Sequence, residues 1–124
     1  MYFIFDLETT GFVNKRDEII EVAGLFLAPD RTFIEDAKFE ELIKPKHPIN
    51  DNILTLTGIT NEDLSNKSSF SVVGKDLLSF IDNVRDNFHE DGVQPTDLVI
   101  LVAHNGKRFD IPFLLMEFEK NNIN

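Results

Sequence analysis

The segment FDLETTG, Phe5–Gly11, follows the apolar opening run MYFIF and places two carboxylates, Asp6 and Glu8, at the end of a predicted strand. Side chains two positions apart on a strand project to the same face, so we expect these two acids to point together. Like charges at close range repel, and each resists desolvation. A shared proton, a basic partner or a divalent cation must therefore compensate them, and the strand itself contains no Lys or Arg.

The spacing of the two acids leaves a simpler alternative open, because acids at the end of a strand can be solvated at the rim of a sheet. Two features favour a binding site. Thr9, Thr10 and Gly11 form a small-residue turn whose backbone can approach a ligand closely. The segment HNGKRFD, residues 104–110, follows a second apolar strand at the equivalent position. A hard cation such as Mg²⁺, held by carboxylates, phosphates and water, fits a site of this kind.

Two residues of this second segment also have simpler interpretations. Asp110 stands directly before an apolar helix that contains Pro112, and taken alone it is typical of a helix N-cap. His104 taken alone is typical of a hydrogen-bonded histidine at the end of a strand. A functional interpretation is favoured only when these residues are combined with the two acids of the first strand.

The pattern of apolar residues predicts an α/β domain with a mixed sheet and helices packed on it. Two segments rich in Phe, Ile and Val and a third, more loosely alternating one have short connections, which favours an antiparallel meander. An amphipathic helix then leads to a short apolar strand, expected to be buried on both faces, and to a last helix. The predicted strands are Tyr2–Glu8, Glu18–Leu27, Thr32–Ile43 and Leu98–Ala103, and the predicted helices are Ser71–Phe88 and one from near Pro112 to near Lys120.

Composition limits the possible classes of protein. A chain of 124 residues that is 42% hydrophobic, with 12 Phe, fits a single globular domain over residues 1–124. A formal net charge of −10 argues against broad neutralisation of phosphates, so any nucleic acid must be held locally or with the help of a metal.

The absence of Cys excludes disulfides and zinc-thiolate sites. Without a signal-like start or a long apolar run, we expect an intracellular protein, cytoplasmic or nuclear, that is not secreted and has no membrane partner.

Four segments, FDLETTG, DEIIEVAGLFL, LTGIT and VAHNGKRFDIPFL, occur in an order and at separations that resemble the DEDD superfamily of 3′-5′ exonucleases. The similarity is to its DnaQ-like group, with RNase T and the proofreading subunits of the DNA polymerase III epsilon type, and it covers residues 2–118. The resemblance implies an RNase H-like fold, which agrees with the predicted order of strands and helices.

The resemblance also implies roles for individual residues. Asp6, Glu8 and Asp110 match three of the four acids that are catalytic in the family and hold two divalent cations, Mg²⁺ or Mn²⁺, for phosphodiester hydrolysis. The residues implied to bind substrate are Thr9, Thr10, Gly11, Ile59, Thr60, Asn105 and Phe109. The implied partners are single-stranded or 3′-terminal DNA or RNA and a polymerase or another replication or repair protein.

The sequence departs from the family pattern at its end. Family members carry a third motif, a His followed five residues later by an Asp, and the residues after Asp110 contain neither. We therefore expect this chain to lack the general base, the fourth carboxylate, and the last strand and helix of the fold. We expect a truncated form of a metal-dependent exonuclease with little activity of its own. The alternative is a catalytically inactive RNase H-like module that binds nucleic acid or protein.

Overall fold

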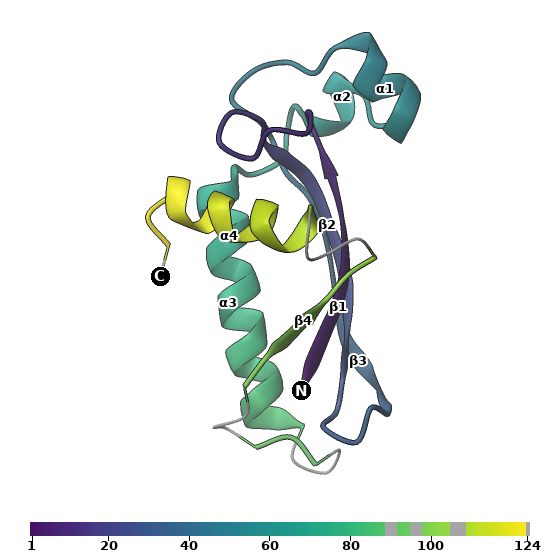
Figure 1. Ribbon diagram of the computed structural model, residues 1–124, viewed down its shortest axis with the longest axis vertical. Helices are drawn as coiled ribbons and strands as arrows, with labels where there is room; N and C mark the ends of the chain where they lie inside the picture. The colour runs from purple at the N-terminus through teal and green to yellow at the C-terminus, as the bar shows by residue number, and fades with distance from the viewer. Residues whose placement is uncertain (89–91, 95–97, 105–108, 124) are drawn as a thin grey trace.

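The computed structural model describes residues 1–88, 92–94, 98–104 and 109–123 and shows a sheet with helices packed on it (Figure 1). Its elements are β1 (Tyr2–Thr9), β2 (Ile19–Leu27), β3 (Phe33–Leu42), α1 (Asp51–Thr57), α2 (Asn61–Leu64), α3 (Phe70–Asn87), β4 (Ile100–Val102) and α4 (Asp110–Lys120). Every strand and both long helices fall where the sequence predicts them, so the predicted α/β class is confirmed.

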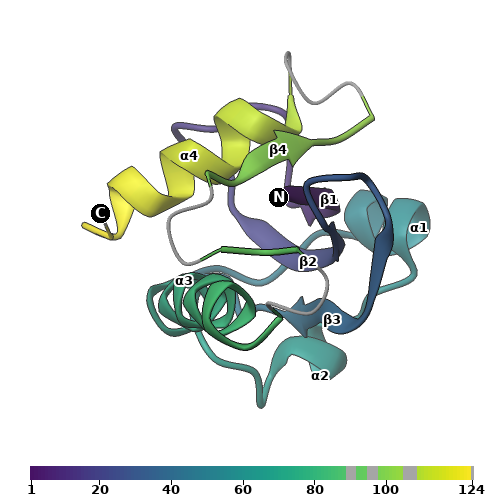
Figure 2. The same cartoon turned by 90° about the horizontal axis from the view of Figure 1, so that it is seen from below.

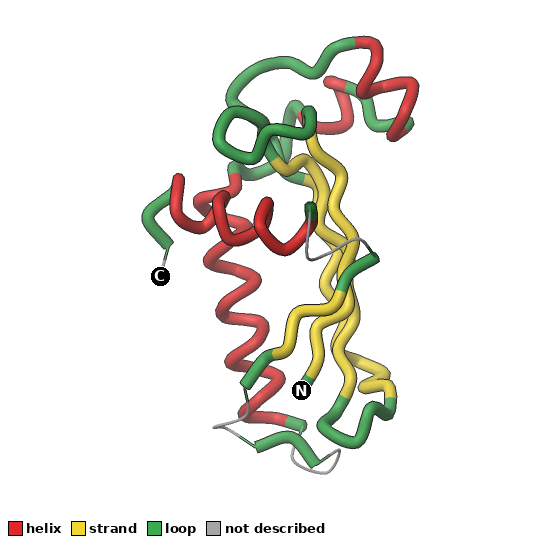
Figure 3. The backbone as a smooth tube through the Cα atoms, in the orientation of Figure 1, coloured by secondary structure: helices red, strands yellow, loops and turns green. Residues whose placement is uncertain are grey.

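The sheet is mixed, with the strand order β3-β2-β1-β4. Strands β1, β2 and β3 form the predicted antiparallel meander, and β4 pairs parallel to β1 (Figure 3). The start of the chain reinforces the parallel pairing, because the Met1 ammonium group donates to the Leu98 carbonyl and the Ile100 N–H donates to the Met1 carbonyl, both at 2.9 Å. Parallel pairing brings the carboxyl ends of β1 and β4 to the same edge of the sheet.

In strand β1, buried apolar residues alternate with more exposed ones, as expected for a strand with one face on the core. Phe3, Phe5 and Leu7 are buried, whereas Asp6 between them is exposed. The Phe3 ring stacks on Phe26 of β2 with ring centroids 4.7 Å apart. Helices α3 and α4 lie on the same side of the sheet in both ribbon views and cover this apolar face (Figures 1 and 2). Asp6 therefore projects away from the apolar core.

Helix α3 is the amphipathic helix that the sequence predicts. Val73, Leu77, Ile81 and Val84 recur at helical spacing and are buried against the sheet. Gly74 allows the chain end to pack closely, because a Cβ there would lie 2.8 Å from the Ile123 side chain. Along the described residues, no helix is both long and apolar enough to cross a membrane.

Two short helices, α1 and α2, lie where the sequence predicted no element. Each is held by local caps: the Asn50 side chain accepts from the Ile53 N–H, and Gly58 ends α1 in the left-handed region at φ 73°. Thr60 and Asp63 form a reciprocal capping box around α2. Both helices are too short to show an apolar repeat, and this is why periodicity missed them.

The prediction that β4 is buried on both faces is wrong. Ile100 is 49% exposed and Val102 38% exposed. The strand lies at the edge of the sheet, and no further strand pairs with it among the residues that the structure describes. An apolar cavity of about 450 Å³ opens beside it, between α3 and α4 and lined by Phe3, Leu77, Leu101 and Leu114 among others. An apolar run of this length looks the same in sequence whether one face or both are covered.

Candidate active site at the carboxyl end of β1

The acids that the sequence singles out come from the carboxyl end of β1 and from the start of α4, which lie at the same edge of the sheet. The parallel register pairs Ile4 with Val102, so Asp6 and Glu8 follow the last residue of β1 that pairs with β4. Asp110 is the first residue of α4, which begins after β4 has ended. The fold thus brings together two parts of the sequence more than 100 residues apart, as the shared edge of parallel strands requires.

Asp110 is almost fully buried, at 5% exposure, yet it is not the helix cap that the simpler interpretation suggested. The N-cap of α4 is Phe109, and no side-chain cap hydrogen bond is formed. The pKa of Asp110 is raised, first by burial and then by the charge of Asp6. A hydrogen bond with the backbone of Leu7 and the charge of His104 act in the opposite direction on this pKa. Asp110 is thus a buried acid facing another acid.

Glu8 shares this electrostatic environment. It is half-buried, and its pKa is raised first by burial and then by the charges of Asp6, Glu21 and Asp110. The three acids predicted to act together therefore lie within electrostatic reach of one another. Carboxylates near one another supply negative charge and oxygen donors, the donor type that hard divalent cations prefer.

The geometry of a metal centre is not formed by these side chains as they stand. Among the residues that the structure describes, no three His, Cys, Asp or Glu side chains are grouped so as to hold a metal ion. The donor chemistry fits a divalent cation and the electrostatic coupling places the acids near one another, so the metal site stays a prediction.

An apolar cavity of about 160 Å³ adjoins Glu8. Its lining residues are Leu7, Glu8, Thr9, Gly11, Phe12, Ile53, Leu56, Thr57 and Phe109. The Phe12 and Phe109 rings meet edge to face with centroids 6.0 Å apart. Phe12 is 83% exposed and Leu56 74% exposed, so large apolar side chains share this cavity with Glu8 at the surface. A flat aromatic ligand could stack on such a surface.

The seven residues expected to bind substrate divide into three groups. Thr9, Gly11 and Phe109 line the cavity beside Glu8. Thr10, Ile59 and Thr60 do not line it: Thr10 bonds to Glu18, Ile59 packs in a small apolar cluster, and Thr60 caps α2. Asn105 lies outside the described residues.

Sequence reasoning missed Phe12 and Leu56, the two most exposed apolar side chains of the cavity. A signal for both was present, because each is a large apolar residue in a segment without a predicted strand or helix. An isolated apolar residue of this kind has no core to join, and a binding surface is one reason for it to be there.

The turn that carries the cavity wall is held in place from α4. Glu117 is buried at 2% exposure, its Oε1 lies 2.6 Å from Lys120 Nζ, and its Oε2 accepts from the Ile19 N–H at 3.3 Å. The same Lys120 Nζ donates to the Asp17 carbonyl at 2.8 Å. Gly11 is required by a close approach, since a Cβ there would lie 2.4 Å from Asp17 Oδ2. These contacts fix the β1–β2 connection beside the acids.

Comparison with known proteins gives a consistent result. A family model described as Exonuclease matches residues 3–90. The PolC-type DNA polymerase III of Ureaplasma parvum is 36% identical over 113 residues, which is 91% of this chain and 7% of that protein. The PolC-type enzyme of Mycoplasma genitalium is 34% identical over 122 residues, 98% of this chain and again 7% of the relative.

Solved structures show the same fold. Exonuclease I of E. coli in complex with a dT13 oligonucleotide superposes with a TM-score of 0.77 at 17% identity, over 99% of this chain and 24% of that one. The predicted RNase H-like arrangement is thereby confirmed. This chain therefore spans only a small part of the length of the relatives that it matches.

Proposed function

Because this chain belongs to the DEDD superfamily of 3′-5′ exonucleases, we propose that it forms the part of a metal-dependent exonuclease that holds the 3′ end of a DNA or RNA strand. The observation that carries the proposal is that Asp6, Glu8 and Asp110 lie within electrostatic reach of one another, where an apolar cavity adjoins Glu8. The acids would repel a phosphate on their own, whereas acids together with cations would attract it.

We infer that these three acids hold two divalent cations, Mg²⁺ or Mn²⁺. When bound, such cations activate the attacking water and stabilise the leaving 3′-oxygen. The chain supplies fixed negative charge at the place where the cations are needed. Burial and mutual repulsion raise the pKa values of Glu8 and Asp110, and a cation beside them would relieve both costs.

We propose that the cavity beside Glu8, which we call the nucleotide cavity, takes the base of the terminal nucleotide. The rings of Phe12 and Phe109 provide a surface on which a base can stack, and the turn at Thr9 and Gly11 allows a backbone to come close. Every base has a π face, so this mode of binding would be largely independent of sequence.

A second candidate is a non-catalytic module that binds nucleic acid or protein. It is favoured by the arrangement of the acids as they stand, because among the described residues no three His, Cys, Asp or Glu side chains are grouped so as to hold a metal ion.

Single-turnover hydrolysis of a 3′-tailed oligonucleotide in Mn²⁺ separates the two candidates. We expect slow shortening from the 3′ end that is lost in Asp110→Asn and kept in Asp76→Asn, a matched change of an exposed aspartate on α3. Tight binding with no shortening would favour the module. Equal shortening by wild type and Asp110→Asn would contradict the assignment of the acids.

The relatives named PolC-type DNA polymerase III suggest the setting in which such a domain works. We propose a polymerase or another replication or repair protein as its partner. Action on nucleic acid in that setting implies an intracellular location.

A further inference from the structure

A second cavity, of about 170 Å³, collects positive charge in an otherwise acidic chain, and we call it the basic cleft. Five of the twelve Lys and Arg residues line it, against two of the 22 Asp and Glu residues. The cations are Lys15, Arg16, Lys44, Lys46 and Lys120, and the acids are Glu18 and Glu117. In a chain with a formal charge of −10, this is a place where an anion meets local attraction rather than repulsion.

The two acids of the basic cleft are already engaged within the protein. Glu117 pairs with Lys120 at 2.6 Å and accepts from the Ile19 N–H. Both carboxylate oxygens of Glu18 accept from the Lys46 backbone N–H at 3.0 Å. Their negative charge therefore holds the walls of the cleft together and is partly offset by these donors.

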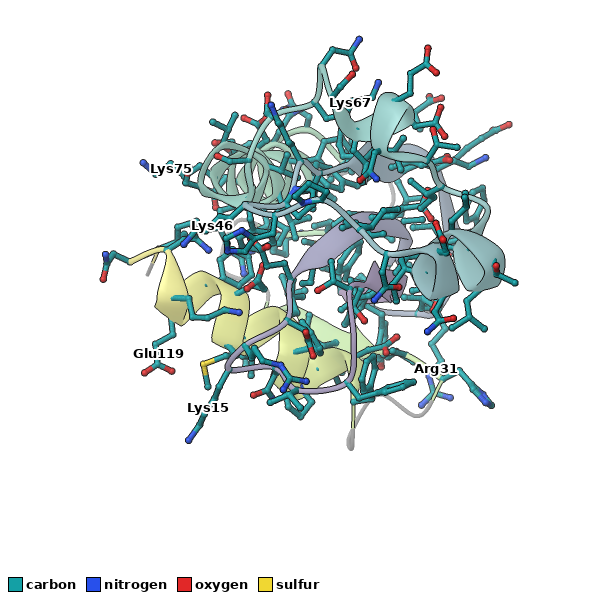
Figure 4. All side chains as sticks on the ribbon, turned by 90° about the horizontal axis from the view of Figure 1, so that it is seen from above. Lys15, Arg31, Lys46, Lys67, Lys75 and Glu119 are labelled. Atoms are coloured by element: carbon teal, nitrogen blue, oxygen red, sulfur yellow. The ribbon has the colours of Figure 1, made fainter. Side chains whose placement is uncertain are left out.

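Three of the cations are available to an external ligand. In the part of the chain that the structure describes, the Lys15, Lys44 and Lys46 side chains form no ion pair, and all three are exposed. Arg16 lies 3.5 Å from Asp17 with its own side chain 75% exposed. Figure 4 shows Lys15 and Lys46 on the side of the molecule where α4 ends.

Backbone hydrogen bonds hold the segments that carry these lysines, whose side chains form no ion pair within the described ranges. The Lys44 N–H donates to the Ser68 carbonyl at 2.9 Å, which ties the 44–50 loop to the segment before α3. Lys120 donates to the Asp17 carbonyl at 2.8 Å, which ties α4 to the β1–β2 connection. Three separate segments thus present cations toward one cavity, and a ligand would not have to order the backbone first.

The basic cleft and the nucleotide cavity share the β1–β2 connection. Thr10 and Glu18 exchange two hydrogen bonds across its base, N–H to carbonyl at 2.8 Å and N–H to Oγ1 at 2.9 Å. Gly11 and Phe12 line the nucleotide cavity, whereas Lys15, Arg16 and Glu18 line the basic cleft. In Figure 1 this connection lies between α1 and the carboxyl half of α4. A strand that ends in the nucleotide cavity could continue over the connection into the cleft.

We propose that the basic cleft binds backbone phosphates of the nucleic-acid strand whose 3′ end occupies the nucleotide cavity. This inference rests on the proposed function. Lysine ammonium groups are point-charge partners for phosphate and fix the path of a strand without reading its sequence. The continuity with the nucleotide cavity favours a nucleic-acid strand over an acidic protein segment.

The test compares two double variants of equal charge. Lys15→Gln with Lys46→Gln removes cations from two walls of the cleft, and Lys67→Gln with Lys75→Gln removes two exposed cations outside it. Affinity for labelled dT12 and dT3 is measured by fluorescence anisotropy in Ca²⁺ at several salt concentrations. Each phosphate contact to a single strand contributes about 0.7 to the slope of the logarithm of affinity against the logarithm of salt concentration. Loss of two contacts lowers this slope by about 1.4, so relative to 1 M salt the cleft variant should bind dT12 about 25-fold more weakly at 0.1 M salt. Binding of dT3 should be unchanged, as should binding of dT12 to the control.

Other outcomes overturn the inference. Equal losses in both double variants would mean a general effect of charge, and an equal loss for dT3 would place the lysines at the terminal nucleotide. Tighter binding of an oligo-glutamate peptide than of dT12 would assign the cleft to an acidic protein. If hydrolysis occurs but does not depend on the cleft lysines, the proposed function stands and this inference is wrong. If binding depends on the cleft lysines but no hydrolysis occurs, this inference stands and the proposed function is wrong.

Discussion

Helix α4 carries two buried carboxylates with opposite surroundings. Glu117, near its end, has its own cation in Lys120 and a backbone donor in Ile19. Asp110, at its start, faces Asp6, and no Lys or Arg of the described residues pairs with it. A buried acid that serves stability comes with its partner, because an unpaired buried charge is costly. The repulsion from Asp6 at this buried position favours a cation as the partner of Asp110.

The largest expected change in stability follows from substitution of Glu117, the acid that has its own cation. Glu117→Ala leaves the Lys120 charge and the Ile19 N–H without their partner, and loss of one member of a buried pair costs about 3 kcal/mol. Urea unfolding should show a lower midpoint with an unchanged slope. A variant as stable as wild type would mean that this ion pair is no more than a surface contact. Glu119→Ala, an exposed neighbour on α4, is the control.

At the start of α4 we expect substitution of the buried acid to raise the free energy of unfolding instead of lowering it. Asp110→Asn keeps the shape of the side chain and removes a buried charge that repels Asp6, so in metal-free buffer at pH 7.5 we expect a gain of about 1 kcal/mol. The same urea experiment checks it. A loss of stability comparable to that of Glu117→Ala would show that Asp110 has a structural partner after all.

A smaller effect follows from pH. The folded pKa of Asp110 is raised, so the folded state binds the proton more tightly than the unfolded state does. The contribution of this group to stability is fully present below its ordinary pKa of 3.8 and is lost as pH rises through the folded value. Wild type should therefore lose stability relative to Asp110→Asn over that window, as followed by thermal melts. A difference that stays constant with pH would contradict the raised pKa.

Local pattern predicted much of the fold. The alternation of Phe3, Phe5 and Leu7 around Asp6 placed β1, and the helical spacing of Leu77 and Ile81 placed α3. What it could not predict depends on contacts that sequence spacing does not show. The exposed edge of β4 depends on which strand pairs with it, and the periodicity of an apolar run is the same in either case.

The acids of the site could be predicted from the sequence, whereas fewer of the contacts around them could. Asp6, Glu8 and Asp110 stood out because their segments resemble a known family, and the fold brings them near one another. The bond between Glu117 and Ile19 spans 98 positions and left no local signal. The helices around Leu56 were detectable only from caps such as the pair Thr60 and Asp63.

Mn²⁺ titration by isothermal calorimetry tests the central claim, that the acids at the end of β1 and the start of α4 form one divalent-cation site. The variants are Asp6→Ala and, as a control, Asp76→Ala on the exposed face of α3. We predict that wild type and Asp76→Ala bind Mn²⁺ and that Asp6→Ala does not, because Asp6 interacts with both other acids. Undiminished binding by Asp6→Ala would contradict the assignment of the site.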